Sequence, residues 1–321
     1  MATSLNGKGT ILENHALSVG VVGVYSRWCA NRVVAEADLV LFVGSRTGDM
    51  VTNAWRVPKP GTPVIQIDIN PSELGRSYPN TVALLGDAKI TLQKLIAHLG
   101  SKKATTQWAK YAQELVQEWW QEVDPFYRSP EVPIRPERLC REIAAVLPAD
   151  GVLVADTGLS ATWTATLVPL IHPQQRFIRC AGSLGWGFPG ALGVKCALPE
   201  RPVICFTGDG GFFYHLSELE TARRCGINLV TVVNNNHCLG QCVENVNRIY
   251  GERPGKKEEL YNFREVNFAR IAEEMGCVGI RVEDPEKIAP ALKMALQANA
   301  PVVVDVATAV QYNVATPWTP P

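Results

Sequence analysis

The strongest chemical signal in this sequence is a glycine-rich segment with a single carboxylate. Residues 207–211 read TGDGG and directly follow an apolar run that is typical of a buried strand. Further along the chain, a helical pattern and a second apolar run lead into three consecutive asparagines. Glycines let the backbone approach a phosphate closely, and Asp209 and Asn236 offer oxygen ligands of the kind that Mg²⁺ prefers. The spacing therefore predicts an oxygen-only Mg²⁺ site that holds a diphosphate group.

A tight turn without a ligand is the alternative for the GDG tripeptide taken alone. The context favours a site, because the tripeptide lies in a strand–turn–helix–strand order and the second strand ends at the asparagines. The carboxyl ends of parallel strands meet at one edge of a sheet, where open α/β sheets bind their ligands. We therefore expect Asp209 and Asn236 to lie close together.

The elements that must position these residues alternate along the whole chain. Six short apolar runs predict strands at 39–43, 64–69, 152–155, 203–206, 229–233 and 302–306. Helical patterns are found between several of them, at 89–98, 136–147, 217–225 and 285–297. Runs that are apolar on both faces are typical of parallel strands, so the sequence predicts α/β architecture with doubly wound parallel sheets.

A domain boundary is expected near the middle of the chain. Residues 108–123 show an amphipathic helical spacing, and the following segment 124–136 holds four prolines, which is typical of a linker. We therefore expect a partial Rossmann-like domain at 1–105, a helix and linker at 106–133, and a second domain at 134–321. The first domain contains two clear strands, so either another chain completes it or a segment upstream is missing.

Composition limits the classes of protein to consider. Hydrophobic residues make up 46% and charged residues 19%, and Lys+Arg and Asp+Glu both total 31, so no charge excess favours nucleic acid or an anionic membrane. No apolar run reaches the about 18 residues that a spanning helix needs, and the N-terminus lacks the apolar segment of a secretory signal. The nine cysteines form no CxxC pair, so we expect buried free thiols in a reducing cytoplasm rather than a zinc site.

The main motif resembles that of thiamine-diphosphate enzymes of the acetolactate synthase, pyruvate oxidase and benzoylformate decarboxylase group. The match is GDG at 208–210, then 24 residues, then Asn235 and Asn236, and the likeness extends over essentially the whole chain. The resemblance implies that Asp209, the Asn236 side chain and the Cys238 carbonyl bind Mg²⁺. It also assigns residues to the cofactor, namely Gly208, Gly210, Gly211, Asn235 and Gly240.

A second segment supports the resemblance. Residues 182–193 read GSLGWGFPGALG and are similar to the family segment that cradles the aminopyrimidine ring. The resemblance implies that the Gly182 carbonyl accepts from the ring's amino group, that Ser183 belongs to the same cradle, and that Leu184 is the apolar wedge that bends the cofactor. A glycine-rich helix entry packed against its strand is the alternative.

A third, weaker match is the segment 156–160, which reads DTGLS. It resembles the family loop that reaches the far end of the diphosphate, which assigns Gly158 and Ser160 to the cofactor. Capping of a helix N-terminus explains these two residues equally well.

The first domain resembles the later half of the family's central domain. The segments 36–46 and 64–71 place Arg46 after a glycine and Asp68 at the end of the next strand, where some members bind FAD or ADP. An acid at a strand end suits the recognition of a ribose. Other members keep this domain without a ligand, so both states stay open here.

The resemblance implies thiamine-diphosphate- and Mg²⁺-dependent cleavage or formation of a C–C bond on a 2-keto acid, a transferase or lyase reaction. Acetolactate-synthase-like carboligation is the first expectation. A 2-keto acid decarboxylase, a 2-hydroxyacyl-CoA lyase subunit and a non-catalytic cofactor-binding fragment are the alternatives. Gln241 and Asn245 depart from the pattern of acetolactate synthases, so the substrate stays open.

The family's domain order places the start of this chain inside the central domain. The preceding pyrimidine-binding domain carries the ylide-activating glutamate in the family, so no catalytic residue is assigned here. The resemblance therefore implies a partner chain with that domain and an assembly of at least two chains.

Overall fold

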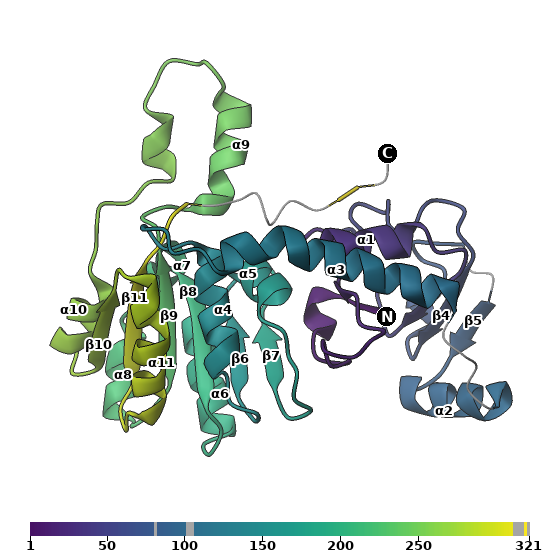
Figure 1. Cartoon of the computed structure of the whole chain (residues 1–321), viewed down its shortest axis with the longest axis horizontal. Coiled ribbons are helices and arrows are strands. Elements are labelled where there is room, and N and C mark those ends of the chain that lie inside the picture. The colour runs from purple at the N-terminus through teal and green to yellow at the C-terminus, as the bar shows by residue number, and fades with distance from the viewer. Residues whose placement is uncertain (80–81, 101–105, 311–317, 320–321) are drawn as a thin grey trace. The chain divides into compact units, whose positions relative to one another are not determined.

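The computed structural model describes residues 1–79, 82–100, 106–310 and 318–319 (Figure 1). The chain divides into two compact units. Unit 1 comprises Met1–Ile11, His15–Glu122 and Thr316–Pro321, and unit 2 comprises Leu12–Asn14 and Val123–Ala315. No helix among the described residues is long and apolar enough to cross a membrane.

Unit 2 is built on a six-stranded sheet in which all neighbouring strands are parallel. Its strand order is β10-β11-β9-β8-β6-β7. The strands are β6 (Val152–Ala155), β7 (Arg176–Arg179), β8 (Val203–Gly208), β9 (Val230–Asn235), β10 (Val278–Val282) and β11 (Val302–Ala307). The four inner strands are buried along almost their whole length, which explains their unbroken apolar runs.

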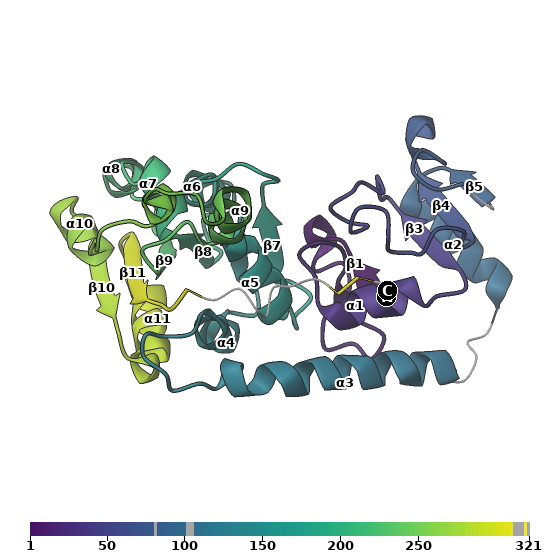
Figure 2. The ribbon, with the colours of Figure 1, turned by 90° about the horizontal axis from the view of Figure 1, so that it is seen from above.

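Helices cover both faces of this sheet, as Figure 2 shows. One face carries α4 (Pro136–Val146), α5 (Leu159–Leu167) and α11 (Ile288–Gln297), which follows the short turn η4 (Pro285–Lys287). The other face carries α6 (Gly187–Ala197), α7 (Asp209–His215), α8 (Glu218–Arg224) and α10 (Phe268–Glu274). The doubly wound α/β architecture predicted for this part of the chain is therefore confirmed.

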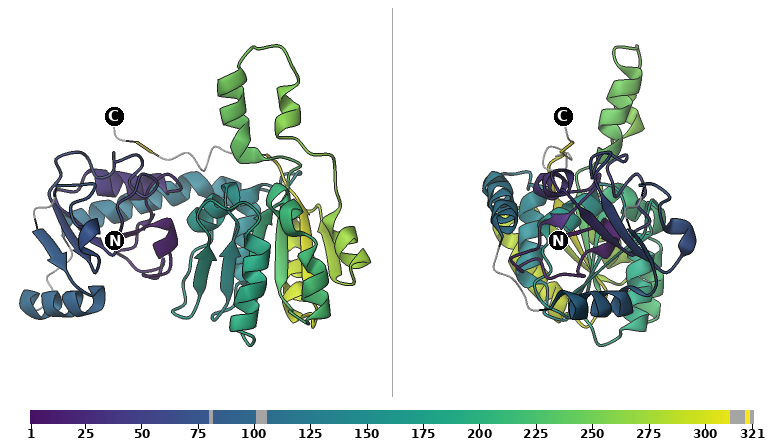
Figure 3. Two further views of the ribbon diagram at one scale, coloured as in Figure 1. Left: turned by 180° about the vertical axis from the view of Figure 1, so that it is seen from behind. Right: turned by 90° about the vertical axis from the view of Figure 1, so that its right-hand side faces the viewer.

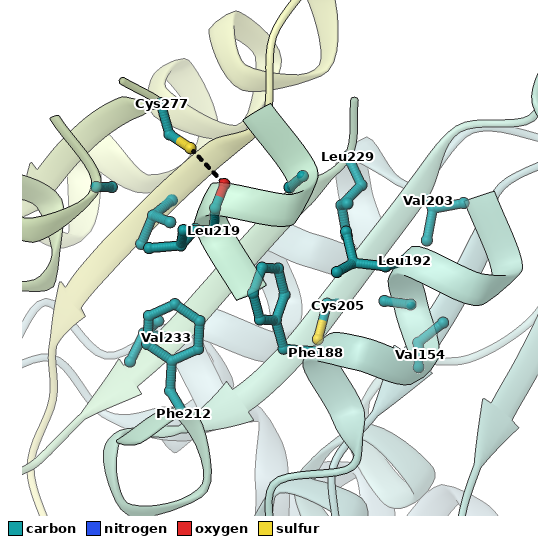
Figure 4. Packing of buried hydrophobic residues seen from close by; sticks show 14 of the residues in the cluster. Val154, Phe188, Leu192, Val203, Cys205, Phe212, Leu219, Leu229, Val233 and Cys277 are labelled. Atoms are coloured by element: carbon teal, nitrogen blue, oxygen red, sulfur yellow. Dashed lines mark hydrogen bonds between the residues drawn. The ribbon is translucent and has the colours of Figure 1, made fainter. Parts of the chain in front are cut away.

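A continuous apolar core lies between the sheet and α6, α7, α8 and α10 (Figure 4). Phe212 packs edge to face against Phe188 and Phe268, with ring centroids 5.3 and 5.5 Å apart. Val154 and Cys205 of the inner strands belong to the same cluster. Burial of such side chains contributes about 1.5–3 kcal/mol each, so the core holds α6 and α7 firmly on the sheet.

One arm of unit 2 extends beyond the carboxyl edge of the sheet (Figures 1 and 3). It consists of α9 (Gly240–Tyr250), a loop, and the short turn η3 (Lys257–Leu260). Gly240 is the one buried residue of α9, so the helix is anchored at its start and exposed along the rest.

Unit 1 holds a second parallel sheet of three strands in the order β3-β4-β5. The elements of the unit are β1 (Ala2–Thr3), η1 (Leu5–Gly7), β2 (Gly20–Val21), α1 (Trp28–Ala35), β3 (Val40–Val43), β4 (Val64–Asp68), η2 (Pro71–Glu73), β5 (Val82–Leu85) and α2 (Ala88–Leu99). β4 is mostly buried, whereas α2 has no buried residue and β3 and β5 are largely exposed.

All six predicted strands exist, each within two residues of its expected ends, and the five predicted helices are present. The sequence missed β5, β7 and β10 at sheet edges and the two-residue strands β1 and β2, which pair with each other. It was also wrong to start a linker at residue 124, because α3 (Gln107–Tyr127) continues through Pro125. Contacts in unit 2 hold this last turn: the Arg135 guanidinium lies 4.4 Å from the Phe126 ring centroid, and the Tyr127 hydroxyl donates to the Leu167 carbonyl.

All nine cysteines are free thiols, as expected, but only part of them are buried. Burial raises the pKa of the Cys29 thiol to about 12, which keeps it protonated. The expectation of burial was wrong for three residues, which are exposed: Cys196, Cys225 and Cys242.

Candidate functional site

A cavity at the carboxyl ends of β8 and β9 brings together most of the predicted site residues. Its wall is formed by the β6–α5 loop, the turn before α6, the start of α7 and the first turn of α9. The predicted residues that line it are Gly158, Ser160, Leu184, Gly208, Asp209, Gly210, Gly211, Asn236, Cys238 and Gly240.

Asp209 is the buried acid of this cavity, at the first position of α7. Its Oδ1 accepts from the Gly210 N–H at 2.6 Å, and its Oδ2 accepts from the N–H groups of Asn236 and Cys238 at 3.1 and 3.2 Å. These bonds join the end of β8 to the end of β9. Burial raises the pKa of Asp209 to about 6, while the N–H donors oppose that shift. A divalent cation at this carboxylate would favour its ionised form.

The Asn236 amide lies beside this carboxylate. Its Oδ1 accepts from the Cys238 N–H at 3.1 Å, and the same N–H donates to Asp209 Oδ2, so the two side-chain oxygens converge. His237, between Asn236 and Cys238 in sequence, has a φ of +57°, a left-handed conformation that turns the chain at this point. A carboxylate and an amide oxygen are hard ligands, so the pair fits Mg²⁺ completed by phosphate oxygens and water.

In the part of the chain that the structure describes, no group of three or more His, Cys, Asp or Glu side chains could hold a metal ion, around the cavity or elsewhere. The side-chain oxygens around Asp209 are those of its own carboxylate and of the Asn236 amide.

The glycines at the start of α7 are required by the neighbouring side chains. A Cβ on Gly210 would lie 2.5 Å from Leu239 Cδ2, and a Cβ on Gly211 would collide with Asp156 Oδ2. Gly208 has more space, because a Cβ there would lie 3.6 Å from Ser160 Oγ. The GDGG sequence therefore allows β6, β8 and the chain after β9 to approach each other around the cavity.

Asp156 organises the cavity wall, although the sequence analysis assigned it no separate role. It is fully buried at the end of β6, and both of its oxygens accept from the Gly185 N–H, at 3.1 and 3.0 Å. Oδ2 also accepts from the Thr207 hydroxyl at 3.0 Å, and Oδ1 from the Gly187 N–H at 3.3 Å. These bonds tie the turn that carries Leu184 to the ends of β6 and β8. Its place at the end of a buried strand, like that of Asp209, was the available signal.

Two family models match the chain. The model described as the thiamine pyrophosphate enzyme, C-terminal TPP binding domain, matches residues 156–306, and the one described as the thiamine pyrophosphate enzyme, central domain, matches residues 1–95. Together they cover well over half of the chain. The chain belongs to the thiamine pyrophosphate enzyme family. The cofactor of that name is thiamine diphosphate, so the family predicted from the GDG and asparagine motif is confirmed.

Similar proteins include several acetolactate synthase large subunits. A probable large subunit from Methanococcus aeolicus is 31% identical over 322 residues, which cover 96% of this chain and 53% of that protein. The Haemophilus influenzae large subunit is 31% identical over 317 residues, with 95% and 53% covered. The isozyme 3 large subunit from Escherichia coli is 29% identical over 315 residues, with 94% and 53% covered. The chain spans about half the length of the curated relatives it matches.

Three of the residues assigned to thiamine diphosphate do not line the cavity: Gly182, Ser183 and Asn235. The Asn235 amide nitrogen donates to Asp305 Oδ1 and to the Val266 carbonyl, both at 2.9 Å. Asp305 is fully buried and also accepts from the Phe268 N–H and from Arg281. In the structure, Asn235 ties the end of β9 to β11 and α10, and a contact with the cofactor stays a prediction.

The cavity has further lining residues that the sequence did not single out for the cofactor. They are Thr157, Leu159, Asn234, Leu239, Gln241 and Cys242. Gly158 is the N-cap residue of α5, with a φ of +75°, and no side chain caps this helix, so Ser160 does not act as a cap. A Cβ on Gly158 would lie 3.2 Å from Gln241 Oε1, which places the start of α9 beside the start of α5.

Unit 1 has a cavity in the equivalent position of its own sheet. Arg46 and Asp68, the residues matched to nucleotide binding, both line it, together with glycines at the ends of β3 and β5. Asp68 Oδ1 accepts from the Asn70 N–H at 2.8 Å, and Arg76 donates to the Arg46 carbonyl at 2.9 Å. The structure thus brings Arg46 and Asp68 to one place.

Proposed function

We propose that this chain binds thiamine diphosphate and Mg²⁺ and serves the formation or cleavage of a C–C bond on a 2-keto acid, with acetolactate-synthase-like carboligation as its activity. The observation that carries the proposal is the convergence of the Asp209 and Asn236 oxygens on the Cys238 N–H, beside main-chain glycines at the ends of two parallel strands. The acetolactate synthase names of the similar proteins support carboligation.

The residues of the chain have distinct tasks in this proposal. When bound, thiamine diphosphate supplies the reactive carbon and the electron sink for chemistry next to a carbonyl. Asp209, Asn236 and the Cys238 carbonyl would hold Mg²⁺, which neutralises the diphosphate. Gly208 and Gly210 leave room for the diphosphate at the main chain, and Leu184 offers an apolar contact in the same cavity.

The proposal places the glutamate that activates the cofactor on a partner chain. Within the described residues, no glutamate lines the cavity, so the acid would reach the site from elsewhere. The active form would be an oligomer in the cytoplasm. Binding of FAD or ADP in unit 1 is a separate proposal, supported by Arg46 and Asp68 at one cavity.

Calorimetric titration of the purified chain with thiamine diphosphate in the presence of Mg²⁺ tests the binding step. Turnover of pyruvate is then measured for the chain alone and for the chain with any polypeptide that co-purifies from its source. We expect binding by the chain alone and acetolactate formation only with the partner. Failure to bind would reject the proposal, and turnover by the chain alone would reject the need for a partner.

Product analysis separates the remaining activities. Gln241 lines the cavity and departs from the acetolactate synthase pattern. For this reason a 2-keto acid decarboxylase or a 2-hydroxyacyl-CoA lyase is the second candidate. Acetaldehyde without acetolactate would identify a decarboxylase, and cleavage of a 2-hydroxyacyl-CoA would identify a lyase. Binding without turnover in every mixture would leave a non-catalytic cofactor-binding subunit.

A further inference from the structure

One buried polar side chain of the cavity has an unpaired atom. Asn234 is 5% exposed and lines the cavity, and its Oδ1 is buried without a hydrogen-bond partner. An unpaired amide oxygen in a protein interior is costly, and most buried polar groups in native structures have partners. An amide whose oxygen is left unpaired beside a cavity therefore points to a ligand that changes the hydrogen bonding of this side chain.

The strand register shows which part of the cavity Asn234 serves. Asn234 pairs with Gly208 of β8 in the parallel ladder, and Gly208 lies beside Ser160 Oγ. Successive side chains of a strand point to opposite faces of the sheet. The Asn235 amide bonds to Asp305 on one face, so Asn234 points to the other face, toward the start of α5.

The wall next to Asn234 is rich in hydrogen-bond donors. α5 begins at Leu159 without a side-chain cap and without an acidic residue in its first turn. The first N–H groups of a helix have no partners within the helix and favour an anion. Ser160 adds a hydroxyl in the same turn, so this side of the cavity suits phosphate oxygens.

We propose that Asn234 is a further cofactor-binding residue, which donates a hydrogen bond from its amide to a phosphate oxygen of the diphosphate group. The proposal rests on the proposed function. The terminal torsion of an asparagine is soft and close to two-fold, so the amide can present either end to a ligand. A phosphate selects the nitrogen end, because its oxygens are acceptors. Asn234 and the first turn of α5 then hold the diphosphate from the side opposite Asp209.

Binding measurements on the full chain test this proposal with two probes, thiamine diphosphate and inorganic pyrophosphate, each with Mg²⁺. Asn234→Leu removes the amide at similar volume, and Asn228→Leu makes the same change just before β9, at the other end of this strand. We expect Asn234→Leu to weaken both probes by the same factor, about tenfold or more, and Asn228→Leu to bind as the unmodified chain does. The melting temperature without ligand should stay equal or rise, because a buried amide oxygen without a hydrogen-bond partner is removed.

Unchanged affinity for both probes in a folded Asn234→Leu chain would overturn the proposal, and so would an equal loss in Asn228→Leu. If Asn234→Leu does not fold, Asn234→Ala provides the same comparison. The two proposals fail differently. If the unmodified chain binds neither probe, the proposed function fails and this inference fails with it. If the unmodified chain binds both and the Asn234 variants bind equally well, only the role of Asn234 is rejected.

Discussion

The two larger parallel sheets of this chain each have a cavity at the same topological position, but they differ in how well helices and loops cover them. In unit 2 the inner strands are buried almost throughout, and three phenylalanine rings pack against them on one face. In unit 1, Leu41 and Val43 of β3 are 40% and 39% exposed, and α2 has no buried residue. The parallel topology therefore places a cavity at the strand ends in both units, whereas the burial of the strands differs between the two sheets.

The difference in cover matters for the acids at the strand ends. Asp209 and Asp156 are buried, and each accepts hydrogen bonds from groups on other segments of the chain. Asp68 in unit 1 accepts from the N–H two residues further along its own chain segment. Donors from separate segments hold a carboxylate in one orientation only if the core keeps those segments together. The site of unit 2 is thus positioned by its core, and the cavity of unit 1 is positioned more locally.

The largest expected effect tests the core of unit 2 against the sheet of unit 1. Phe212→Ala should lower the free energy of unfolding by about 3–5 kcal/mol, because it leaves a cavity among buried rings. The matched change Leu41→Ala in unit 1 should cost less than about 1 kcal/mol, because Leu41 is already 40% exposed. Denaturant unfolding measures both. Equal losses would contradict the contrast in cover.

The next prediction compares the acid of the unit 2 cavity with the acid of the unit 1 cavity. Asp209→Asn should weaken the binding of thiamine diphosphate with Mg²⁺ about 100-fold or more, because a neutral amide replaces the charged metal ligand. The fold should change little. Asp68→Asn in unit 1 is the control and should leave this binding unchanged. Calorimetry on both variants gives the comparison, and intact binding by Asp209→Asn would show that the metal assignment is wrong.

A smaller effect is expected at the carboxylate that organises the cavity wall. Asp156→Asn should lower the free energy of unfolding by about 2 kcal/mol, because an NH₂ group replaces an oxygen that accepts from buried donors. Asp124→Asn removes an exposed ion pair with Arg128 and should cost less than about 0.5 kcal/mol. Urea unfolding of the two variants checks this. If both changes cost the same, Asp156 does not have the organising role.

The smallest effect on stability concerns the open edge of the unit 1 sheet. Among the described residues, no strand pairs with the outer edge of β3. Leu41→Lys should change the free energy of unfolding by less than about 0.5 kcal/mol, since surface substitutions rarely do more. It should nevertheless reduce self-association, because charge on an edge strand discourages pairing with another chain. Size-exclusion chromatography at increasing protein concentration tests this. Unchanged self-association would show that chains do not associate through this edge.

The sequence alone predicted which polar residues meet at the strand ends. The runs before Asp209 and before the asparagines are apolar without alternation, so they predict buried parallel strands. The carboxyl ends of such strands share one edge of the sheet. The meeting of Asp209 with Asn236 followed from that rule, and the structure shows it. Edge strands such as β7, whose four residues include two arginines, lack this signal, and the sequence missed them.

The structure was needed to divide the roles among neighbouring residues. Asn234 and Asn235 are identical in type and adjacent in sequence, yet one lines the cavity and the other bonds to Asp305. Alternation along a strand shows that they point to opposite faces, but not which face the cavity opens on. That choice depends on where α5 and α9 pack, which residues far away in the sequence decide. The sequence by itself thus determined which atoms are offered at the strand ends, and the tertiary structure decided which of them face the cavity.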